Sequence, residues 1–352
     1  MSTTAAPTLQ VAHASGLHAV EHQLALMHQE MLRNGGEDAG MARLSVLNLV
    51  AACTDPESAE IASQTVGLIA QAHPARAIIV LADRTAADGI EADVSLQCAT
   101  TPRGQICAEQ VLLTVGGRPA RHLGSVITPL LVSDVPVVLW LVGAPPLEQA
   151  FGSEAIALCE RIIVDTGAYD DPVATIAVVT AALNGHGGEF ELADLAWARL
   201  RRWRELVAQA FDGTEMRGLL RHITSVEICA NGVAVSAGAW LFAGWLAAQL
   251  RWEGNAPRIE VSARVAPDLP RRELLTVRVR CETEQRTAAI TVERQPTTLG
   301  VTLEGSGGPS AARAVPLRDL DTVRLVGGLL EETAGDPVYP AALRSAHALA
   351  KR

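Results

Sequence analysis

The residues with the clearest chemical pattern are His18, Glu21 and His22, which match the H-x-x-E-H arrangement of inverted zinc proteases. On a helix this spacing places the two histidines one turn apart, as two ligands of one zinc ion must lie. A zinc site also needs a third ligand and a water beside the glutamate, and no second fragment of such a protease signature follows. We therefore interpret the motif as the solvated face of an amphipathic helix and expect no metal.

The signatures of common cofactor and catalytic sites are missing from the sequence. No G-x-G-x-x-G follows a predicted strand, and there is no G-x-x-x-x-G-K-[ST] phosphate loop or G-x-S-x-G elbow. The glycines at 116–117 and 305–310 are typical of flexible turns. These observations disfavour dinucleotide dehydrogenases, kinases and α/β-hydrolases. We expect no cofactor and no catalytic site.

The segment 194–204, DLAWARLRRWR, concentrates four arginines and two of the six tryptophans in an acidic chain. Arg and Trp are common at the centres of protein interfaces, and a group of arginines can also bind a sugar phosphate. The alternative is a helix that packs its apolar side inward while its arginines extend along the surface. The candidate partner interface consists of Trp197, Arg201, Arg202 and Arg204.

Two cysteines form a candidate redox pair. The segments 92–99 and 106–115 alternate as strands do, and the residues 101–104 between them, TPRG, are typical of a type I turn. In the hairpin that this turn predicts, Cys98 lies directly opposite Cys107 as a non-hydrogen-bonded pair. Such pairs have Cα atoms about 4.5 Å apart, at the near edge of the range for a disulfide. The alternative is two reduced thiols that pack as small apolar residues.

Aliphatic runs predict the elements that position these residues in the first half. Residues 1–12 predict a disordered tail, and apolar residues at a/d spacing from Leu17 to Met31 predict an amphipathic helix. Asp55 and Pro56 are typical of the start of a helix, which we expect to reach residue 72. A further helix is expected at 120–131 and another at 172–183. The expected strands are 44–52, 77–81, 92–99, 106–115, 135–142 and 162–164.

The second half predicts a long helix at 192–211, a helix at 237–252, and two closing helices at 316–333 and 338–350. Its expected strands are 223–229, 258–265, 274–282, 286–294 and 298–304. The fold class is α/β: two mixed α/β domains with aliphatic central sheets, plus the N-terminal amphipathic helix. The expected domains are 1–40 (tail and helix), 41–184 and 185–352.

Composition limits the partners. Hydrophobic residues make up 49% of the 352 residues and aromatic residues only 3%, which suits aliphatic α/β cores. A formal net charge of −10 disfavours nucleic acid and anionic membranes as partners. No apolar run reaches the length of a membrane span, the first residues do not resemble a secretory signal, and six cysteines are too few for a disulfide scaffold. The cytoplasm is the expected location.

Five stretches, taken together with their order along the chain, resemble the OpcA family of proteins that assemble and activate glucose-6-phosphate dehydrogenase. The resemblance implies a two-domain α/β protein that binds this dehydrogenase and raises its activity in the oxidative pentose phosphate pathway. It also implies a link to thiol state, with thioredoxin as a possible further partner, and it supplies no catalytic residues. The stretches are 73–80, 105–111, 125–140, 194–204 and 241–247.

The sequence therefore predicts a non-catalytic activator and assembly factor, which acts by binding one conformation of the dehydrogenase better than another. The alternative is a sugar-phosphate-binding enzyme or sensor of the same pathway, such as a lactone hydrolase. A cleft with converging Arg and His side chains would favour the alternative. A broad apolar face without such a cleft would favour the activator.

Overall fold

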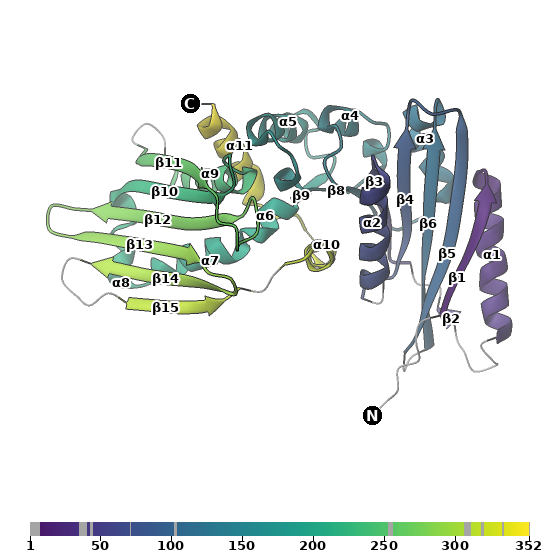
Figure 1. Cartoon of the computed structure of the whole chain (residues 1–352), viewed down its shortest axis with the longest axis horizontal. Helices are drawn as coiled ribbons and strands as arrows, with labels where there is room; N and C mark the ends of the chain where they lie inside the picture. Colours follow the sequence, from purple (N-terminus) through teal and green to yellow (C-terminus); the bar gives the residue numbers. More distant parts are fainter. Residues whose placement is uncertain are drawn as a thin grey trace. The chain divides into compact units, whose positions relative to one another are not determined.

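The chain folds into two compact units, each assembled from three separate segments. A computed structural model describes residues 8–34, 41–42, 45–70, 72–101, 104–252, 256–305, 311–317, 320–332 and 334–351. The described residues form an α/β protein with two mixed sheets, of nine and six strands (Figure 1). The first unit comprises 1–165, 186–193 and 322–335, and the second comprises 166–185, 194–321 and 336–352.

The sheet of the first unit has the strand order β1-β5-β6-β4-β3-β7-β8-β9, with β2 paired to β6. Neighbours from β6 through β4, β3 and β7 to β8 run parallel, whereas β1, β5 and β6 pair antiparallel. The parallel strands are buried aliphatic runs, as expected for strands covered on both faces. The strands are β1 (Thr8–Ser15), β2 (Met41–Ala42), β3 (Leu47–Cys53), β4 (Ala75–Asp83), β5 (Gly89–Thr101), β6 (Gly104–Gly116), β7 (Val137–Leu141), β8 (Arg161–Val164) and β9 (Glu191–Asp194).

Helix α2 joins β3 to β4 and starts where the sequence predicts. Asp55 accepts a hydrogen bond from the Ser58 backbone N–H at 2.8 Å, Pro56 occupies the first turn, and the Ser58 hydroxyl completes a capping box. The hydrogen bond from Ser58 lowers the pKa of the Asp55 carboxyl. The helices of this unit are α1 (Leu17–Asn34), α2 (Pro56–Ile69), α3 (Leu123–Ile127), α4 (Leu147–Phe151) and α10 (Thr322–Glu331), with 3₁₀ turns η1 (Pro119–Arg121), η2 (Thr128–Leu130) and η3 (Ile156–Leu158).

The sheet of the second unit has the order β11-β10-β12-β13-β14-β15, antiparallel except for the parallel pair β10 and β11. Its strands alternate buried and accessible residues, so only one face is packed on a core. The strands are β10 (Ile223–Asn231), β11 (Arg258–Arg264), β12 (Leu274–Glu282), β13 (Thr287–Arg294), β14 (Thr298–Gly305) and β15 (Ala311–Pro316).

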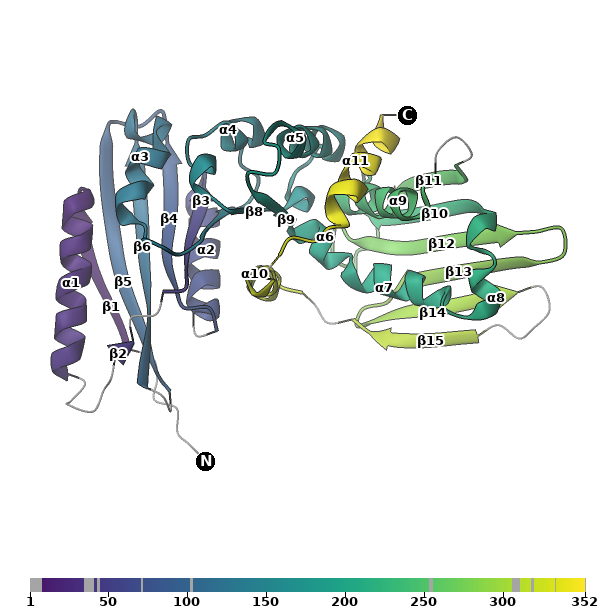
Figure 2. The same ribbon diagram turned by 180° about the vertical axis from the view of Figure 1, so that it is seen from behind.

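Helices α7 and α9 lie on the packed face of this sheet, as the view from behind shows (Figure 2). Helix α9 is apolar all round and is also covered by α11 and α5. The helices of this unit are α5 (Pro172–Gly185), α6 (Leu195–Arg199), α7 (Arg201–Ala210), α8 (Thr214–Arg217), α9 (Ala237–Leu250) and α11 (Tyr339–Ala350), with 3₁₀ turns η4 (Thr166–Ala168) and η5 (Leu220–His222). Among the described residues, no helix combines the length and the hydropathy that crossing a membrane requires.

A single buried arginine joins the three segments of the first unit. The Arg161 guanidinium, at the start of β8, binds Glu191 Oε2 at 2.6 Å and the backbone carbonyls of Leu329 and Glu332 at 2.6 and 2.7 Å. Its partners therefore come from both of the other segments. Because a buried cation must be paired, this geometry holds β8, β9 and the end of α10 in one arrangement.

A buried carboxylate has the same role in the second unit. Asp194 accepts hydrogen bonds from the Thr166 hydroxyl at 2.7 Å, the Ala196 backbone N–H at 2.9 Å and the Tyr339 hydroxyl at 3.0 Å. These donors lie one in each of the three segments. Burial, together with the adjacent Asp194 carboxylate, raises the pKa of Tyr339 well above its usual value, so the phenol remains a proton donor.

Four expectations about the elements are wrong. Residues 8–15, expected within and just after a disordered tail, form β1, which pairs with the edge of β5. The helix expected at 192–211 begins only after Asp194, whose side chain caps α6, and is interrupted at Leu200 between α6 and α7. The helix expected at 120–131 consists of three short turns, η1, α3 and η2. Strand β15 was not expected.

The other expected strands and helices are present, with ends shifted by a few residues. Residues 1–7 of the expected tail, the turn residues Pro102 and Arg103, and residues 306–310 of the glycine-rich segment lie outside the described residues. The sequence places one domain division after residue 184. In the structure α5 is part of the second unit and 322–335 is part of the first.

Gly244 allows α9 and α11 to approach closely. A Cβ atom at this position would lie 2.3 Å from the Ala342 carbonyl oxygen and 2.5 Å from the Ala346 nitrogen. We expect Gly244→Ala to lower the free energy of unfolding by about 1–3 kcal/mol, because two backbones must separate. Gly238→Ala is the control on the same helix, since its Cβ would meet its nearest atom at 3.8 Å. Denaturant unfolding of both variants measures the difference, and equal stabilities would contradict the packing described here.

Replacing Asp194 tests the joint in the second unit. Asp194→Asn keeps the shape but turns one acceptor atom into a donor that faces the hydroxyl groups, so we expect a loss of at least about 2 kcal/mol in the free energy of unfolding. Asp212→Asn, at an exposed position of the same unit, should leave that free energy unchanged within about 0.5 kcal/mol. Denaturant titration followed by circular dichroism compares them. If Asp194→Asn lowers the free energy of unfolding no more than the control does, Asp194 does not hold the three segments together.

Candidate functional site

The structure separates the four residues of the candidate partner interface into two pairs. Trp197 is only 4% exposed, and its indole N–H donates to Asp336 Oδ2 at 2.7 Å. The Arg204 guanidinium lies 3.5 Å from the centroid of the Trp197 ring and pairs with Asp336 at 3.5 Å. Trp197 is therefore buried and Arg204 half-buried inside the second unit, so neither is the freely exposed side chain that the expectation assumed, and their role in a partner interface stays a prediction.

Asp336 is an anion that this core requires. Burial alone would raise the pKa of its carboxyl, but the hydrogen bonds from Trp197 and the Val338 backbone N–H, with the charge of Arg204, outweigh that effect and lower the pKa. The Trp197 and Tyr339 rings lie 5.4 Å apart between centroids. The two carboxylates Asp194 and Asp336 thus hold α6, α7 and α11 together through aromatic and arginine side chains.

Arg201 and Arg202 are the exposed pair. Their side chains are 71% and 39% exposed, and both lie near the carboxylate of Glu205, at 3.6 and 2.9 Å. Glu205 offsets part of their positive charge, and such surface pairs contribute little to stability. These two arginines are available to a partner from α7, and their role in an interface stays a prediction.

The hairpin of β5 and β6 pairs Cys98 with Cys107, the register that the sequence predicts. Thr101 and Gly104 are the last paired residues before the turn, as expected. The side chains of both cysteines lie outside what the structure describes, so the disulfide itself stays a prediction.

Three cysteines elsewhere are poor nucleophiles. Burial raises the pKa of the Cys53 and Cys159 thiols to about 12 and that of Cys281 to about 11. Only the thiolate reacts readily with oxidants, so these three thiols are protected at neutral pH.

The H-x-x-E-H motif forms one side of α1, and its glutamate has a structural partner. Glu21 Oε1 lies 2.6 Å from Arg76 Nη1, and Arg76 also pairs with the buried Glu109 of β6. His18 and His22 are exposed. The described residues contain no group of three or more side chains that could hold a metal ion.

One face of the six-stranded sheet is open, a feature that the sequence did not predict. It is the face opposite α7 and α9, it faces the viewer in Figure 1, and no helix among the described residues covers it. Arg278 pairs with Glu304 at 3.2 Å, and Arg280 pairs with Glu227 at 3.3 Å, across the strands of this face. Thr291 and Thr302, which continue the row from Arg278 across β13 and β14, are half-buried. The face is thus broad and of mixed charge, whereas an apolar face was expected of an activator.

Alternating polar and apolar residues in β12 indicate that the sheet has an accessible face. From Thr276 to Glu282 the sequence T-V-R-V-R-C-E places polar side chains at every second position, which is the pattern of a sheet with one solvated side. The pattern shows that one face is accessible but does not show which neighbouring strands extend it.

Comparison with protein-family models gives two matches in order along the chain. Residues 67–181 match the model described as the glucose-6-phosphate dehydrogenase subunit N-terminal domain (OpcA_G6PD_assem), and residues 190–343 match the corresponding C-terminal domain (OpcA_G6PD_C). The first match runs from the end of α2 through β4 to β8 and most of α5, and it begins after β3. The second includes the whole six-stranded sheet.

Two curated relatives carry the same name. A "Putative OxPP cycle protein OpcA" of Nostoc punctiforme is 30% identical over 188 residues, 53% of this chain and 40% of the relative. The protein of that name from Synechocystis is 28% identical over 187 residues, 52% of this chain and 38% of its own. The chain therefore spans about two fifths of the length of these relatives.

One solved structure, a Gfo/Idh/MocA family oxidoreductase from Vibrio cholerae, aligns with 87% of this chain and 97% of its own at 11% identity, with a TM-score of 0.35, which is too weak a likeness to support a conclusion. The two family models, by contrast, agree with the five sequence stretches and with the names of the curated relatives. On these matches, the chain belongs to the OpcA family.

Proposed function

We propose that this protein is a non-catalytic activator and assembly factor that binds glucose-6-phosphate dehydrogenase and raises its activity in the oxidative pentose phosphate pathway. The observation that carries the proposal is the pair of matches to domains described as subunits of that dehydrogenase. A partner raises activity only by binding the active conformation better than the inactive one. The protein should therefore bind the active conformation of the dehydrogenase more tightly than the inactive conformation.

We place the contact with the dehydrogenase on the open face of the six-stranded sheet. This face lies within the segment that matches the C-terminal subunit domain. It carries both charge signs in paired positions, which suits a complementary protein surface and sets register and association rate. The rival surface on α7 retains only Arg201 and Arg202, and Glu205 offsets them.

The alternative, a sugar-phosphate-binding enzyme or sensor, would need a groove with converging Arg and His side chains. Arg84, Arg121 and His122 line a groove of the first unit together with Glu148 and Glu154. The two carboxylates balance the two arginines, so a phosphate would meet no excess of positive charge there. This balance gives the alternative no specific support over the activator.

Activation kinetics test the proposal. Without the dehydrogenase, the protein should turn over no glucose 6-phosphate. Titrated into its cognate dehydrogenase, it should raise kcat or lower KM until the response saturates, because it shifts the enzyme toward its active conformation. Initial rates of nicotinamide reduction measure both constants. Rates that stay unchanged throughout the titration refute the proposal.

Charge reversal tests the contact surface. The double variant Arg278→Glu/Arg280→Glu should weaken binding to the dehydrogenase by about tenfold or more, since it places like charges where pairs now lie. The double variant Arg201→Glu/Arg202→Glu is matched in charge and lies in the same unit on α7. Biosensor titrations give both dissociation constants, with circular dichroism to show that each variant is folded. If only the α7 variant loses affinity for the dehydrogenase, the interface lies at Arg201 and Arg202, as the sequence predicts.

We propose further that Cys98 and Cys107 form a reversible disulfide. Two thiols give up two protons and two electrons to hydrogen peroxide, which becomes two waters, and one S–S bond forms. Peptide mapping after mild peroxide treatment should find a Cys98–Cys107 link, because the two residues are directly paired across β5 and β6 while Cys53, Cys159 and Cys281 are protected. A thioredoxin should reduce it. If other cysteines are oxidised and no Cys98–Cys107 link is found, the proposed disulfide is wrong.

A further inference from the structure

The first unit contains a cleft of about 640 Å³ at the carboxyl ends of its central strands. Small-molecule sites commonly have volumes of roughly 300–1,000 Å³ and are lined mainly by apolar side chains with a few polar groups. This cleft fits that description. Neither the proposed function nor the comparisons assign a ligand to it.

The floor of the cleft is formed by three adjacent parallel strands. The strand register places Ala52 of β3 beside Val80 of β4 and Leu141 of β7, and it places Val50 beside Leu139. Ala52 is the one residue of β3 that is not fully buried, because the cleft opens above it. The floor residues are Val50, Ala52, Val80, Ala82, Leu139 and Leu141.

The position in the topology is that of a ligand site. The chain leaves β3 for β4 on one side and later returns to β7 on the other side, so the carboxyl end of β3 lies at a point where strand order reverses. In open α/β sheets the crevice at such a point is the usual place of a bound ligand. Helices α3 and α4 supply the walls, through Leu123, Ile127 and Ala150.

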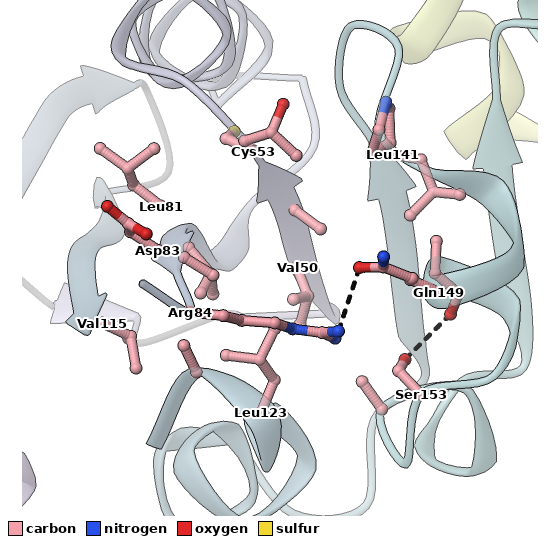
Figure 3. Close-up of a pocket in the computed structure, with 18 of the residues that line it drawn as sticks. Val50, Cys53, Leu81, Asp83, Arg84, Val115, Leu123, Leu141, Gln149 and Ser153 are labelled. Atoms are coloured by element: carbon pink, nitrogen blue, oxygen red, sulfur yellow. Dashed lines mark hydrogen bonds between the residues drawn. The ribbon is translucent and has the colours of Figure 1, made fainter. Parts of the chain in front are cut away.

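The rim carries one cation that has donors to spare. Arg84, directly after β4, reaches across the cleft to Gln149 of α4, and its Nη1 donates to Gln149 Oε1 at 3.0 Å (Figure 3). A guanidinium has five N–H donors, and this is the single hydrogen bond that Arg84 makes among the described residues. The remaining donors are available to an anionic group of a ligand.

The other charged groups at the cleft are already occupied. Asp83 accepts hydrogen bonds from the Thr85 hydroxyl at 2.6 Å and backbone N–H at 2.8 Å, and these bonds lower the pKa of its carboxyl. The amino end of α2 is capped by Asp55, so its first N–H groups do not cradle a phosphate. Glu148 and Glu154, which face Arg84 and Arg121 in the adjoining groove, do not line the cleft, so Arg84 is the cation that an acidic group meets from the cleft side.

We infer that this cleft binds a small amphiphilic organic anion, a molecule with an aliphatic or aromatic body and one acidic group. The body lies on the aliphatic floor of β3, β4 and β7, and the acidic group pairs with Arg84 at the rim. This inference goes beyond the proposed function and does not depend on it.

Two fluorescent probes with the same ring system test it. The probe 8-anilinonaphthalene-1-sulfonate has an apolar body and one anionic group, and N-phenyl-1-naphthylamine is the same body without the sulfonate. Each should bind the folded protein at one saturable site per chain. Ala150→Trp, which fills the cleft from α4, should weaken binding of both probes by about tenfold or more. Arg201→Gln, on an exposed arginine of the second unit, is the control and should change neither.

Arg84→Gln separates recognition of charge from filling of the cleft. It is an exposed position, so the variant should fold, and it should weaken binding of the sulfonate probe by about tenfold, the size of a lost charge-assisted hydrogen bond, while leaving the neutral probe unchanged. The inference is overturned if the folded protein has no saturable site. It is also overturned if Ala150→Trp changes neither probe, or if Arg84→Gln does not discriminate between them.

Discussion

Each unit of this protein depends on one buried charge that holds three chain segments together. Arg161 binds Glu191 and two carbonyls near the end of α10, and Asp194 binds Thr166, Ala196 and Tyr339. A buried charge is costly unless its partners are in place, so each group is satisfied only when all three segments have assembled. Along the sequence, segments of the first unit alternate with segments of the second. The chain passes from one unit to the other between residues 193 and 194, at the end of β9.

The joint at Asp194 also decides which residues remain for a partner. Because Asp194 and Asp336 bind the aromatic and arginine side chains of α6, α7 and α11, Trp197 and Arg204 are used inside the unit. What remains exposed is a sheet face that pairs its own charges and a short row of arginines on α7. An interface built on the sheet face would exchange internal ion pairs for intermolecular ones, at small net cost since such exposed pairs are weak. That exchange favours specificity and fast association over high affinity.

Local sequence chemistry predicts the elements that depend on local signals. The Asp55 cap, the β5–β6 hairpin register and the aliphatic parallel strands follow from the cap, the turn and the apolar runs. The predictions fail where residues far away in the sequence determine the local structure. Thr8–Ser15 is a strand because β5 offers an unpaired edge, and Ala311–Pro316, rich in alanine and ending in proline, is a strand only because β14 lies beside it. Arg and Trp in one segment indicated an interface, but their burial depends on Asp336, which is 139 residues from Trp197. No local pattern shows that contact, nor the cleft, whose floor and walls come from segments between residues 50 and 155.

We propose that this chain binds glucose-6-phosphate dehydrogenase and favours its active conformation. Linkage requires that a protein which raises the affinity of the enzyme for its substrate is itself bound more tightly when the substrate is present, by the same factor. Calorimetric titration of the protein into the cognate dehydrogenase, with and without saturating glucose 6-phosphate, measures both affinities directly. We expect a saturable complex in both titrations and tighter binding with the substrate. Absence of a complex at micromolar concentrations, or an affinity that the substrate leaves unchanged while KM falls, would refute the proposed activation.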